Sequence, residues 1–216
     1  MKLIRTGIAG LDEILLGGLT PGVYILVGSI DSGKEVLAQQ IAYSRAGQNK
    51  ITYFTVSKNP ESIKDEMATY GWNISQYIKE DTWRLTNLTH SKSYATIIQN
   101  EIKQQRSTII DSLSELLITS KIEEVTPILN TMSEQNKEQQ DLHLVLLTTG
   151  MQDQIAETTA QHFADGIIEL MTRWEADNLG RTMAIKKMKG STVPTRRLPY
   201  SIGRNGFTIE TTTRIT

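Results

Sequence analysis

The chain has 216 residues, a formal net charge of −1 and no cysteine. This length suits one domain with a sizeable core, spanning residues 1–216. The near-zero charge gives no overall attraction to nucleic acid or anionic membranes, and the lack of cysteine excludes disulfides and thiolate metal sites. Asp12 and Glu13 interrupt the first apolar run, so we expect no signal peptide, and no stretch reaches the roughly 18–20 apolar residues of a membrane span. We therefore expect a soluble, cytoplasmic protein.

Short apolar runs alternate with longer amphipathic stretches along the chain. The runs are β-branched or aromatic and end at turn or charged residues, which predicts strands at residues 23–27, 51–56, 83–88, 108–111, 143–148, 166–171 and 182–186. The stretches between them predict helices at residues 34–46, 62–70, 94–105, 125–139 and 153–163. Strand followed by helix, repeated, predicts an α/β fold with a mainly parallel sheet flanked by helices. Turn residues after Gly190 predict a C-terminal β-hairpin that ends near residues 207–209.

The first strand leads into a glycine-rich loop and a helix, with the sequence VYILVGSIDSGKEVLAQQIAY over residues 23–43. In the pattern GxxxxGK, glycines let backbone N–H groups converge on phosphate oxygens, the helix N-terminus adds positive potential, and the lysine reaches the terminal phosphates. The strand before and the helix after are the context that this site requires. The candidate nucleotide-binding residues are Gly28, Ser29, Ile30, Asp31, Ser32, Gly33, Lys34 and the residue that follows them, Glu35.

Glu35 departs from the pattern of a working ATP site. A Ser or Thr at this position would ligate Mg²⁺ through its hydroxyl. A carboxylate about 4 Å from a phosphate costs on the order of 4 kcal/mol at an effective dielectric of about 20, before any metal offsets it. Asp31 adds a second acid to the same loop.

Two roles for Glu35 stay open. It could ligate Mg²⁺ directly, since hard cations favour carboxylate oxygens. It could instead pair with Lys34 and occupy the anion pocket at the helix N-terminus. We favour weakened or absent binding of ATP and Mg²⁺, with no cofactor required; a loop that serves only as a turn is a further alternative.

Further segments follow the loop pattern in chain order. Residues 6–12 are TGIAGLD, residues 53–63 are YFTVSKNPESI, residues 107–113 are STIIDSL, residues 164–170 are ADGIIEL and residues 187–190 are KMKG. Together with the phosphate loop, these segments resemble the RecA superfamily, and most closely the KaiC-like proteins. The resemblance spans essentially the whole chain and implies a RecA-like P-loop NTPase fold.

The same resemblance bears on catalysis. In the family, the segment that residues 53–63 resemble carries paired glutamates, one of which polarises the water that attacks the γ-phosphate; here Ser57 and Lys58 stand at those positions. A serine is too weak a base and a protonated lysine accepts no proton, and loss of a general base costs about 10²–10⁴ in rate. Because Glu35 also replaces the metal-binding hydroxyl, we predict that hydrolysis is lost and assign no catalytic residue.

Asp111 closes the strand that resembles the Walker B strand of the family. There, a carboxylate would hold Mg²⁺ through water. Asp111 and Glu35 are therefore the candidate metal ligands. Asp111 could instead cap the helix that follows it.

Residues 181–204 contain seven basic residues and no acid. The resemblance implies that Lys187 and Lys189 face a neighbouring subunit's phosphates. Arg196 and Arg197 are candidates for the same interface or for DNA phosphates, and a solvated hairpin is the third possibility. Residues 150–162, where a RecA-like DNA loop would lie, contain no Lys or Arg, which argues against strong single-strand binding there.

The sequence therefore predicts a non-hydrolysing KaiC-like or RecA-paralogue protein with weak or absent nucleotide binding. It would act as a regulatory or assembly partner, by associating with itself or with an active relative. One alternative is an ATPase that uses another carboxylate, such as Glu61 or Glu66, with Mg²⁺ held by Glu35 and Asp111. Another is a DNA-repair accessory protein that binds DNA through Arg196 and Arg197.

Overall fold

Strands and helices alternate in the structure as the apolar pattern predicts. The computed structural model describes residues 3–89, 91–175 and 178–210. Within them one sheet has the order β3-β2-β4-β5-β1-β6-β7-β8-β9. The strands from β3 to β6 in this order are parallel, and the last three are antiparallel. The strand bounds are β1 Gly22–Gly28, β2 Ile51–Thr55, β3 Trp83–Asn87, β4 Ser107–Asp111, β5 Leu142–Thr148, β6 Gly166–Glu175, β7 Asn178–Met188, β8 Leu198–Gly203 and β9 Gly206–Ile209.

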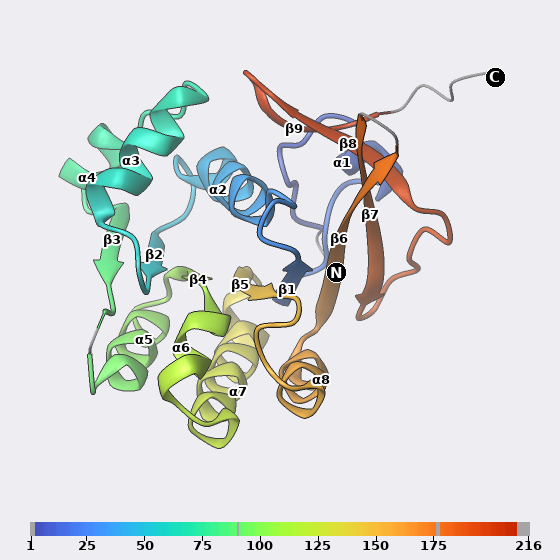
Figure 1. The fold of residues 1–216 in the computed structure, drawn as a ribbon. Coiled ribbons are helices and arrows are strands. Elements are labelled where there is room, and N and C mark those ends of the chain that lie inside the picture. The colour runs from blue at the N-terminus through green and yellow to red at the C-terminus, as the bar shows by residue number, and fades with distance from the viewer. Residues whose placement is uncertain (1–2, 90, 176–177, 211–216) are drawn as a thin grey trace.

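Helices cover both faces of the parallel part of the sheet (Figure 1). One face carries α2 (Lys34–Arg45) and α3 (Pro60–Thr69), and the other carries α5 (Tyr94–Lys103), α6 (Leu113–Thr119), α7 (Ile122–Gln139) and α8 (Gln154–Phe163). Two short helices, α1 (Leu11–Ile14) and α4 (Ser75–Lys79), precede β1 and β3. No helix in the described part of the chain is long and apolar enough to cross a membrane.

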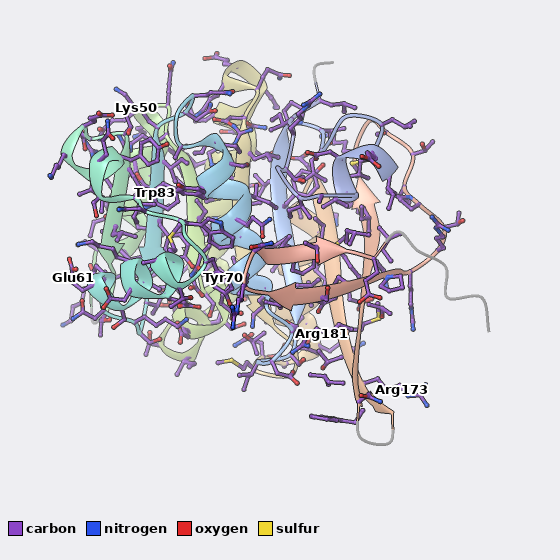
Figure 2. All side chains as sticks on the ribbon, turned by 90° about the horizontal axis from the view of Figure 1, so that it is seen from above. Lys50, Glu61, Tyr70, Trp83, Arg173 and Arg181 are labelled. Carbon is purple, nitrogen blue, oxygen red and sulfur yellow. The ribbon has the colours of Figure 1, made fainter. Side chains whose placement is uncertain are left out.

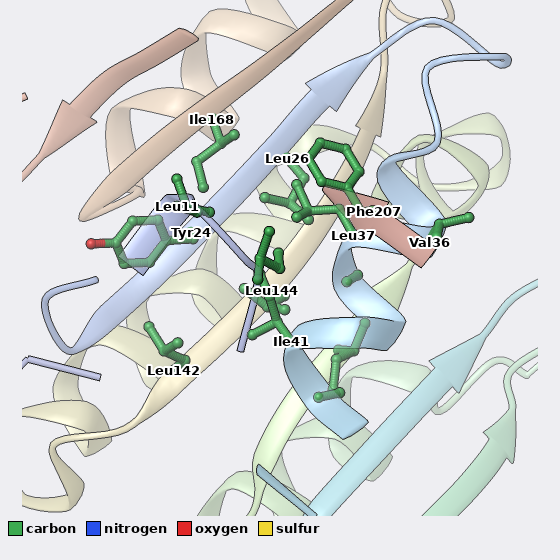
Figure 3. Close-up of a cluster of buried hydrophobic side chains, with 14 of the residues drawn as sticks. Leu11, Tyr24, Leu26, Val36, Leu37, Ile41, Leu142, Leu144, Ile168 and Phe207 are labelled. Carbon is green, nitrogen blue, oxygen red and sulfur yellow. The ribbon is translucent and has the colours of Figure 1, made fainter. Parts of the chain in front are cut away.

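The central strand β1 shows why the sheet requires nearly continuous apolar runs. Tyr24 and Leu26 pack into the cluster on the α2 face, whereas Ile25 and Val27 pack into the cluster on the opposite face. Figure 3 shows the first cluster, where side chains of β1, α2 and β5 meet. Every residue of β1 is buried, because both faces of a parallel sheet are covered.

The predicted fold class is confirmed, including the C-terminal hairpin β8–β9. The first antiparallel hairpin differs from the prediction: β6 continues to Glu175, four residues beyond the predicted end. Gly28, the last residue of β1, pairs with Leu170, so the rest of β6 has no parallel neighbour. It stays extended because β7 supplies its hydrogen bonds, and Figure 2 shows Arg173 on the part of this hairpin that projects beyond the sheet.

The C-terminal hairpin is fastened onto the phosphate loop. The Tyr200 hydroxyl donates a hydrogen bond to the Ser32 carbonyl at 2.7 Å. Gly33 caps α2 with a φ of 76°, and a Cβ built on it would lie 2.0 Å from Cδ1 of Ile202. The loop is therefore closed by β8 on one side, and Gly33 is required both for its backbone conformation and for this close approach.

Gly33→Ala should therefore destabilise the fold more than Gly71→Ala does. Both glycines have a positive φ, but nothing lies within 4 Å of a Cβ at Gly71, so this control carries only the backbone cost. That cost is about 1 kcal/mol, and rotating the Cδ1 end of the Ile202 side chain out of the way adds roughly 0.5–1.5 kcal/mol. Urea unfolding of both variants measures the difference, and equal losses would show that β8 does not press on the loop.

Candidate functional site

The phosphate loop lies at the carboxyl end of β1, the central parallel strand. β1 ends at Gly28 and α2 begins at Lys34, and the Ser32 hydroxyl and amide both donate to the Ser29 carbonyl, at 2.7 and 3.2 Å. A Cβ on Gly28 would lie 2.5 Å from the Ser32 hydroxyl oxygen, so the turn closes only on glycine. The predicted strand–loop–helix geometry is present.

Lys34 is buried and paired with its neighbour in sequence. Only 1% of its side chain is exposed, and its Nζ lies 2.8 Å from Oε1 of Glu35 and 3.3 Å from the Ser29 carbonyl oxygen. A buried ammonium requires a nearby anion, because removing a lone charge from water is costly. Glu35 supplies that anion from the first turn of α2, where the helix dipole also favours negative charge.

Asp31, the other acid of the loop, is exposed. The Ser29 hydroxyl donates to its carboxylate at 2.6 Å and the Thr172 hydroxyl of β6 at 3.3 Å. The hydrogen bond from Ser29 is the main reason that the pKa of Asp31 lies below its ordinary value. Asp31 thus ties the loop to the base of the β6–β7 hairpin.

Asp111 lies at the carboxyl end of β4, buried beside the phosphate loop. The Tyr53 hydroxyl of β2 donates to its Oδ2 at 2.6 Å. Burial raises the pKa of the Asp111 carboxyl to about 6; the Tyr53 hydrogen bond opposes this shift, and the charge of Glu35 adds to it. The alternative role as a helix cap is taken by Ser112, whose hydroxyl accepts from the Glu115 amide at 3.3 Å.

Ser57 and Lys58 follow β2 and face acids from other elements. The Ser57 hydroxyl donates to Oε1 of Glu115 at 2.6 Å, and the Lys58 ammonium lies 3.2 Å from Oε2 of Glu66. Burial lowers the pKa of Lys58, but the charges of Glu66 and Asp111 outweigh it and the net shift is upward. Lys58 is therefore a firmly protonated cation in this environment.

The carboxylates proposed from sequence as substitute bases differ in position. Glu61 is 72% exposed and pairs with Lys64 at 3.2 Å, whereas Glu66 lines the same cleft as Lys58. Sequence reasoning missed Glu115. The spacing Ser112-x-x-Glu115 is a capping-box pattern directly after the Walker B strand, and it could have placed this acid at the start of a helix above the strand end.

One cleft of about 430 Å³ lies between the phosphate loop, the ends of β2 and β4, and the loop after β5, and Asp31 and Glu61 are not part of its lining. Its charged residues are the cations Lys34 and Lys58 and the acids Glu35, Glu66, Asp111 and Glu115. Four acids against two cations give the cleft an excess of negative formal charge, and three acids against two cations remain when Asp111 is protonated.

The basic residues of the C-terminal region lie elsewhere in the molecule. Lys187 pairs in register with Ile167 and donates to the carbonyls of His162 and Ala164, and the Lys189 ammonium lies 3.3 Å from Asp165. They sit near the start of β6, whereas the phosphate loop follows the end of the parallel strand β1. The structure therefore does not bring them to the cleft of their own chain; Arg196 and Arg197 are exposed in the segment before β8.

The strand order, the loop and the Walker B strand together define a RecA-like P-loop protein. A family model described as the KaiC ATPase matches residues 4–214, and the chain belongs to this family. A UPF0273 protein of Thermotoga maritima is 24% identical over 97% of this chain and 96% of its own length. One from Pyrococcus furiosus is 26% identical over 97% and 94%. The crystal structure of a KaiC-like protein from Pyrococcus horikoshii superposes with a TM-score of 0.81 at 21% identity, covering 96% of this chain and 98% of that one.

Because of Asp111, the free energy of unfolding should decrease as pH rises from about 4 to 6. A carboxyl whose pKa rises from 3.8 to about 6 on folding binds its proton more tightly in the folded state, and at neutral pH this costs up to about 3 kcal/mol. Asp111→Asn should remove this pH dependence and stabilise the protein at pH 7–8, since an amide oxygen can still accept from Tyr53. Urea unfolding between pH 4 and 8 tests this.

Asp31→Asn is the matched control for that experiment. The pKa of Asp31 is lowered in the folded state, so its ionisation contributes stability that is lost as pH falls, the opposite of the effect of Asp111. An Asp111→Asn variant that is less stable than the wild type at pH 8 would contradict the assignment of Asp111 as a destabilising buried anion.

Proposed function

We propose that this KaiC-family protein is a non-hydrolysing member that binds ATP weakly or not at all and acts by association with a partner. The observation that carries the proposal is the 2.8 Å ion pair between buried Lys34 and Glu35. The lysine that would hold the terminal phosphates already has an internal carboxylate partner.

Nucleotide binding must overcome this pair. A triphosphate either displaces the Glu35 carboxylate from Lys34 or accepts a like charge at about 4 Å, at a cost on the order of 4 kcal/mol. This corresponds to a loss of roughly 10²–10³ in affinity. Asp111 and Glu115 add to the negative potential of the cleft.

The residues fit Mg²⁺ poorly in the absence of phosphate. Mg²⁺ in such sites takes one or two carboxylates, with substrate phosphates and water completing its shell. Glu35 is bound to Lys34 and one oxygen of Asp111 accepts from Tyr53. Among the described residues, no group of three or more His, Cys, Asp or Glu side chains has the arrangement of a metal site. If Mg²⁺ entered with a nucleotide, Asp111 and Glu35 would be its protein ligands, and it would neutralise charge on the phosphates.

The arrangement around Ser57 and Lys58 also supports a loss of hydrolysis. The Ser57 hydroxyl donates a hydrogen bond to Glu115, and Lys58 is a cation paired with Glu66. Neither side chain can take a proton from an attacking water at neutral pH.

Glu35→Thr should strengthen binding of ATP with Mg²⁺ at least ten-fold, because it removes the competing carboxylate and restores a metal-binding hydroxyl. Isothermal titration calorimetry measures the change. Glu35→Gln is the matched control, because it removes the charge but supplies no hydroxyl that can ligate Mg²⁺. Its gain in ATP affinity should therefore be largely independent of Mg²⁺. Tight binding of ATP by the wild type, unchanged in Glu35→Thr, would exclude the proposed role of the ion pair.

ATP turnover should be absent in the wild type. It should appear only when the metal-binding hydroxyl at position 35 and the glutamates at positions 57 and 58 are both restored. We expect the triple variant Glu35→Thr/Ser57→Glu/Lys58→Glu to release phosphate from ATP at a rate that Lys34→Ala abolishes. The double variant Ser57→Glu/Lys58→Glu, which keeps Glu35, is the control and should stay inactive. Wild-type hydrolysis of several ATP per minute that is lost in Lys34→Ala would sink the proposal.

One observation favours a second candidate, an ATPase with a remodelled site. Glu115 reaches the position of the missing base through its 2.6 Å hydrogen bond with Ser57 and lines the cleft. In such an enzyme Glu115 would polarise the water, and Glu115→Gln would remove turnover that the wild type shows. Equal phosphate release by both proteins would exclude Glu115 as the base.

A further inference from the structure

The strand β2 lies where the connections of the sheet change direction. It pairs with β3 on one side and with β4 on the other, in parallel with both. After β2 the chain leads to α3 on the α2 face, whereas β3 and β4 lead to α5 and α6 on the opposite face (Figure 1). In open α/β sheets, a crevice forms outside the carboxyl ends of the strands at such a point, and ligands bind in it.

A hollow of about 730 Å³ occupies this crevice. Its apolar and aromatic lining consists of Val56, Leu88, Tyr94, Leu116 and Ile118. Leu88 and Leu116 are 2% and 4% exposed, whereas Ile118 is 67% exposed, so the apolar lining runs from the core to the surface. A volume of this size with a mostly apolar lining and a few polar groups is typical of small-molecule sites.

Hydrogen bonds between the strand ends hold the walls of this larger hollow in place. The Leu88 amide donates to the Thr55 carbonyl at 2.8 Å, and the Val56 amide donates to the Asp111 carbonyl at 3.0 Å. The Thr89 hydroxyl donates to the Val56 carbonyl. The ends of β2, β3 and β4 are joined within the chain itself, so the hollow is already formed before a ligand enters.

The charged groups of the larger hollow favour a cation. Glu115 and Glu124 line it against a single lysine, Lys92. The Ser57 hydroxyl donates to Oε1 of Glu115, and within the described parts of the chain Oε2 forms no hydrogen bond. The phosphate-loop cleft, which shares Ser57 and Glu115 with the hollow, also has more acids than cations. An anion in the hollow would therefore meet like charge from both spaces.

We propose that the larger hollow binds a small organic cation, with an aromatic or branched apolar body and a primary ammonium group. The apolar body lies against Leu88 and Leu116, and the ammonium group pairs with Glu115 and Glu124 at the edge of the hollow. Tyr94 adds an aromatic ring, and ammonium groups are attracted to aromatic faces as well as to carboxylates. The site takes a ligand other than a nucleotide, so it goes beyond the proposed function and holds whether or not the cleft binds ATP.

A smaller hollow of about 430 Å³ near the other side of α6 provides an internal control. The acids Glu123 and Asp153 line it, together with Met151 and Ile155, but no aromatic side chain does. Glu123 and Glu124 are neighbours in sequence, both exposed, and each lines a different hollow. Removing charge from one hollow or the other therefore separates a local effect from the overall charge of the protein.

The probe for the site is tryptamine, compared with indole-3-propionate, which carries a carboxylate in place of the ammonium group on the same ring. Changes in amide chemical shifts during an NMR titration locate each ligand and measure its affinity. We expect tryptamine to shift the residues of the larger hollow with a dissociation constant on the order of 1 mM or lower. Indole-3-propionate should bind at least about ten-fold more weakly, because its charge is repelled by the acids.

Two double variants test the role of the acids. Glu115→Gln/Glu124→Gln should weaken tryptamine binding at least about three-fold, since both pairs with the ammonium group lose their charge. Glu123→Gln/Asp153→Asn removes the same number of charges from the smaller hollow and should leave the affinity unchanged. Thr119 is exposed and lines the larger hollow only, so Thr119→Trp should fill it and abolish binding.

Several outcomes would overturn the inference. They are shift changes on another surface, no binding of tryptamine at concentrations far above 1 mM, equal affinity for the two ligands, and equal losses in the two double variants. Urea unfolding curves that match the wild type exclude misfolding, and if Thr119→Trp does not fold, the double variants still decide. None of these measurements involves ATP, so failure here leaves the proposed loss of hydrolysis standing, and the reverse holds as well.

Discussion

The ion pair between Lys34 and Glu35 is the interaction on which the character of the site depends. The phosphate loop places a lysine where it is almost fully buried, and a buried cation needs an anion within a few ångströms. In a nucleotide-binding P-loop protein, the ligand provides that anion. Here the next residue in the sequence provides it, and the helix dipole stabilises the carboxylate there. The loop is therefore electrostatically complete within one chain.

The other polar groups of the cleft follow the same principle. Asp111 accepts from Tyr53, Ser57 donates to Glu115, and Lys58 pairs with Glu66. Each of these groups has a partner from another element of the same chain. These pairs connect β2, β4 and the helices after them. The RecA-like framework of the KaiC family is retained, and in the function that we propose internal pairing at its carboxyl edge takes the place of ATP chemistry.

Exposed apolar side chains also lie at this carboxyl edge of the sheet. Ile30 and Met151, on loops that line the cleft, are exposed, and β6 continues with β7 beyond the end of β1. The antiparallel pairing of β6 with β7 makes this extension possible, because it satisfies the backbone of β6 after its parallel neighbour β1 has ended. Tyr200 and Ile202 of β8 lie against the phosphate loop, at Ser32 and Gly33.

The sequence by itself determined the α/β fold, the phosphate loop, and the two acidic residues, Asp31 and Glu35, that distinguish this loop. Continuous apolar runs predict parallel strands that are buried on both faces. Gly28 and Gly33 predict the turn between β1 and α2. Both signals are local in the sequence. Glu35 was recognisable as a competing anion for the same reason. Tertiary structure alone decided which acids meet Ser57 and Lys58, since Glu66 and Glu115 come from helices that only the sheet order brings together. Tertiary structure also decided that Glu61 faces solvent and that Lys187 and Lys189 lie far from the phosphate loop of their own chain. It decided, too, that β6 continues beyond the end of β1. Each of these features depends on register and packing between segments that are distant in sequence.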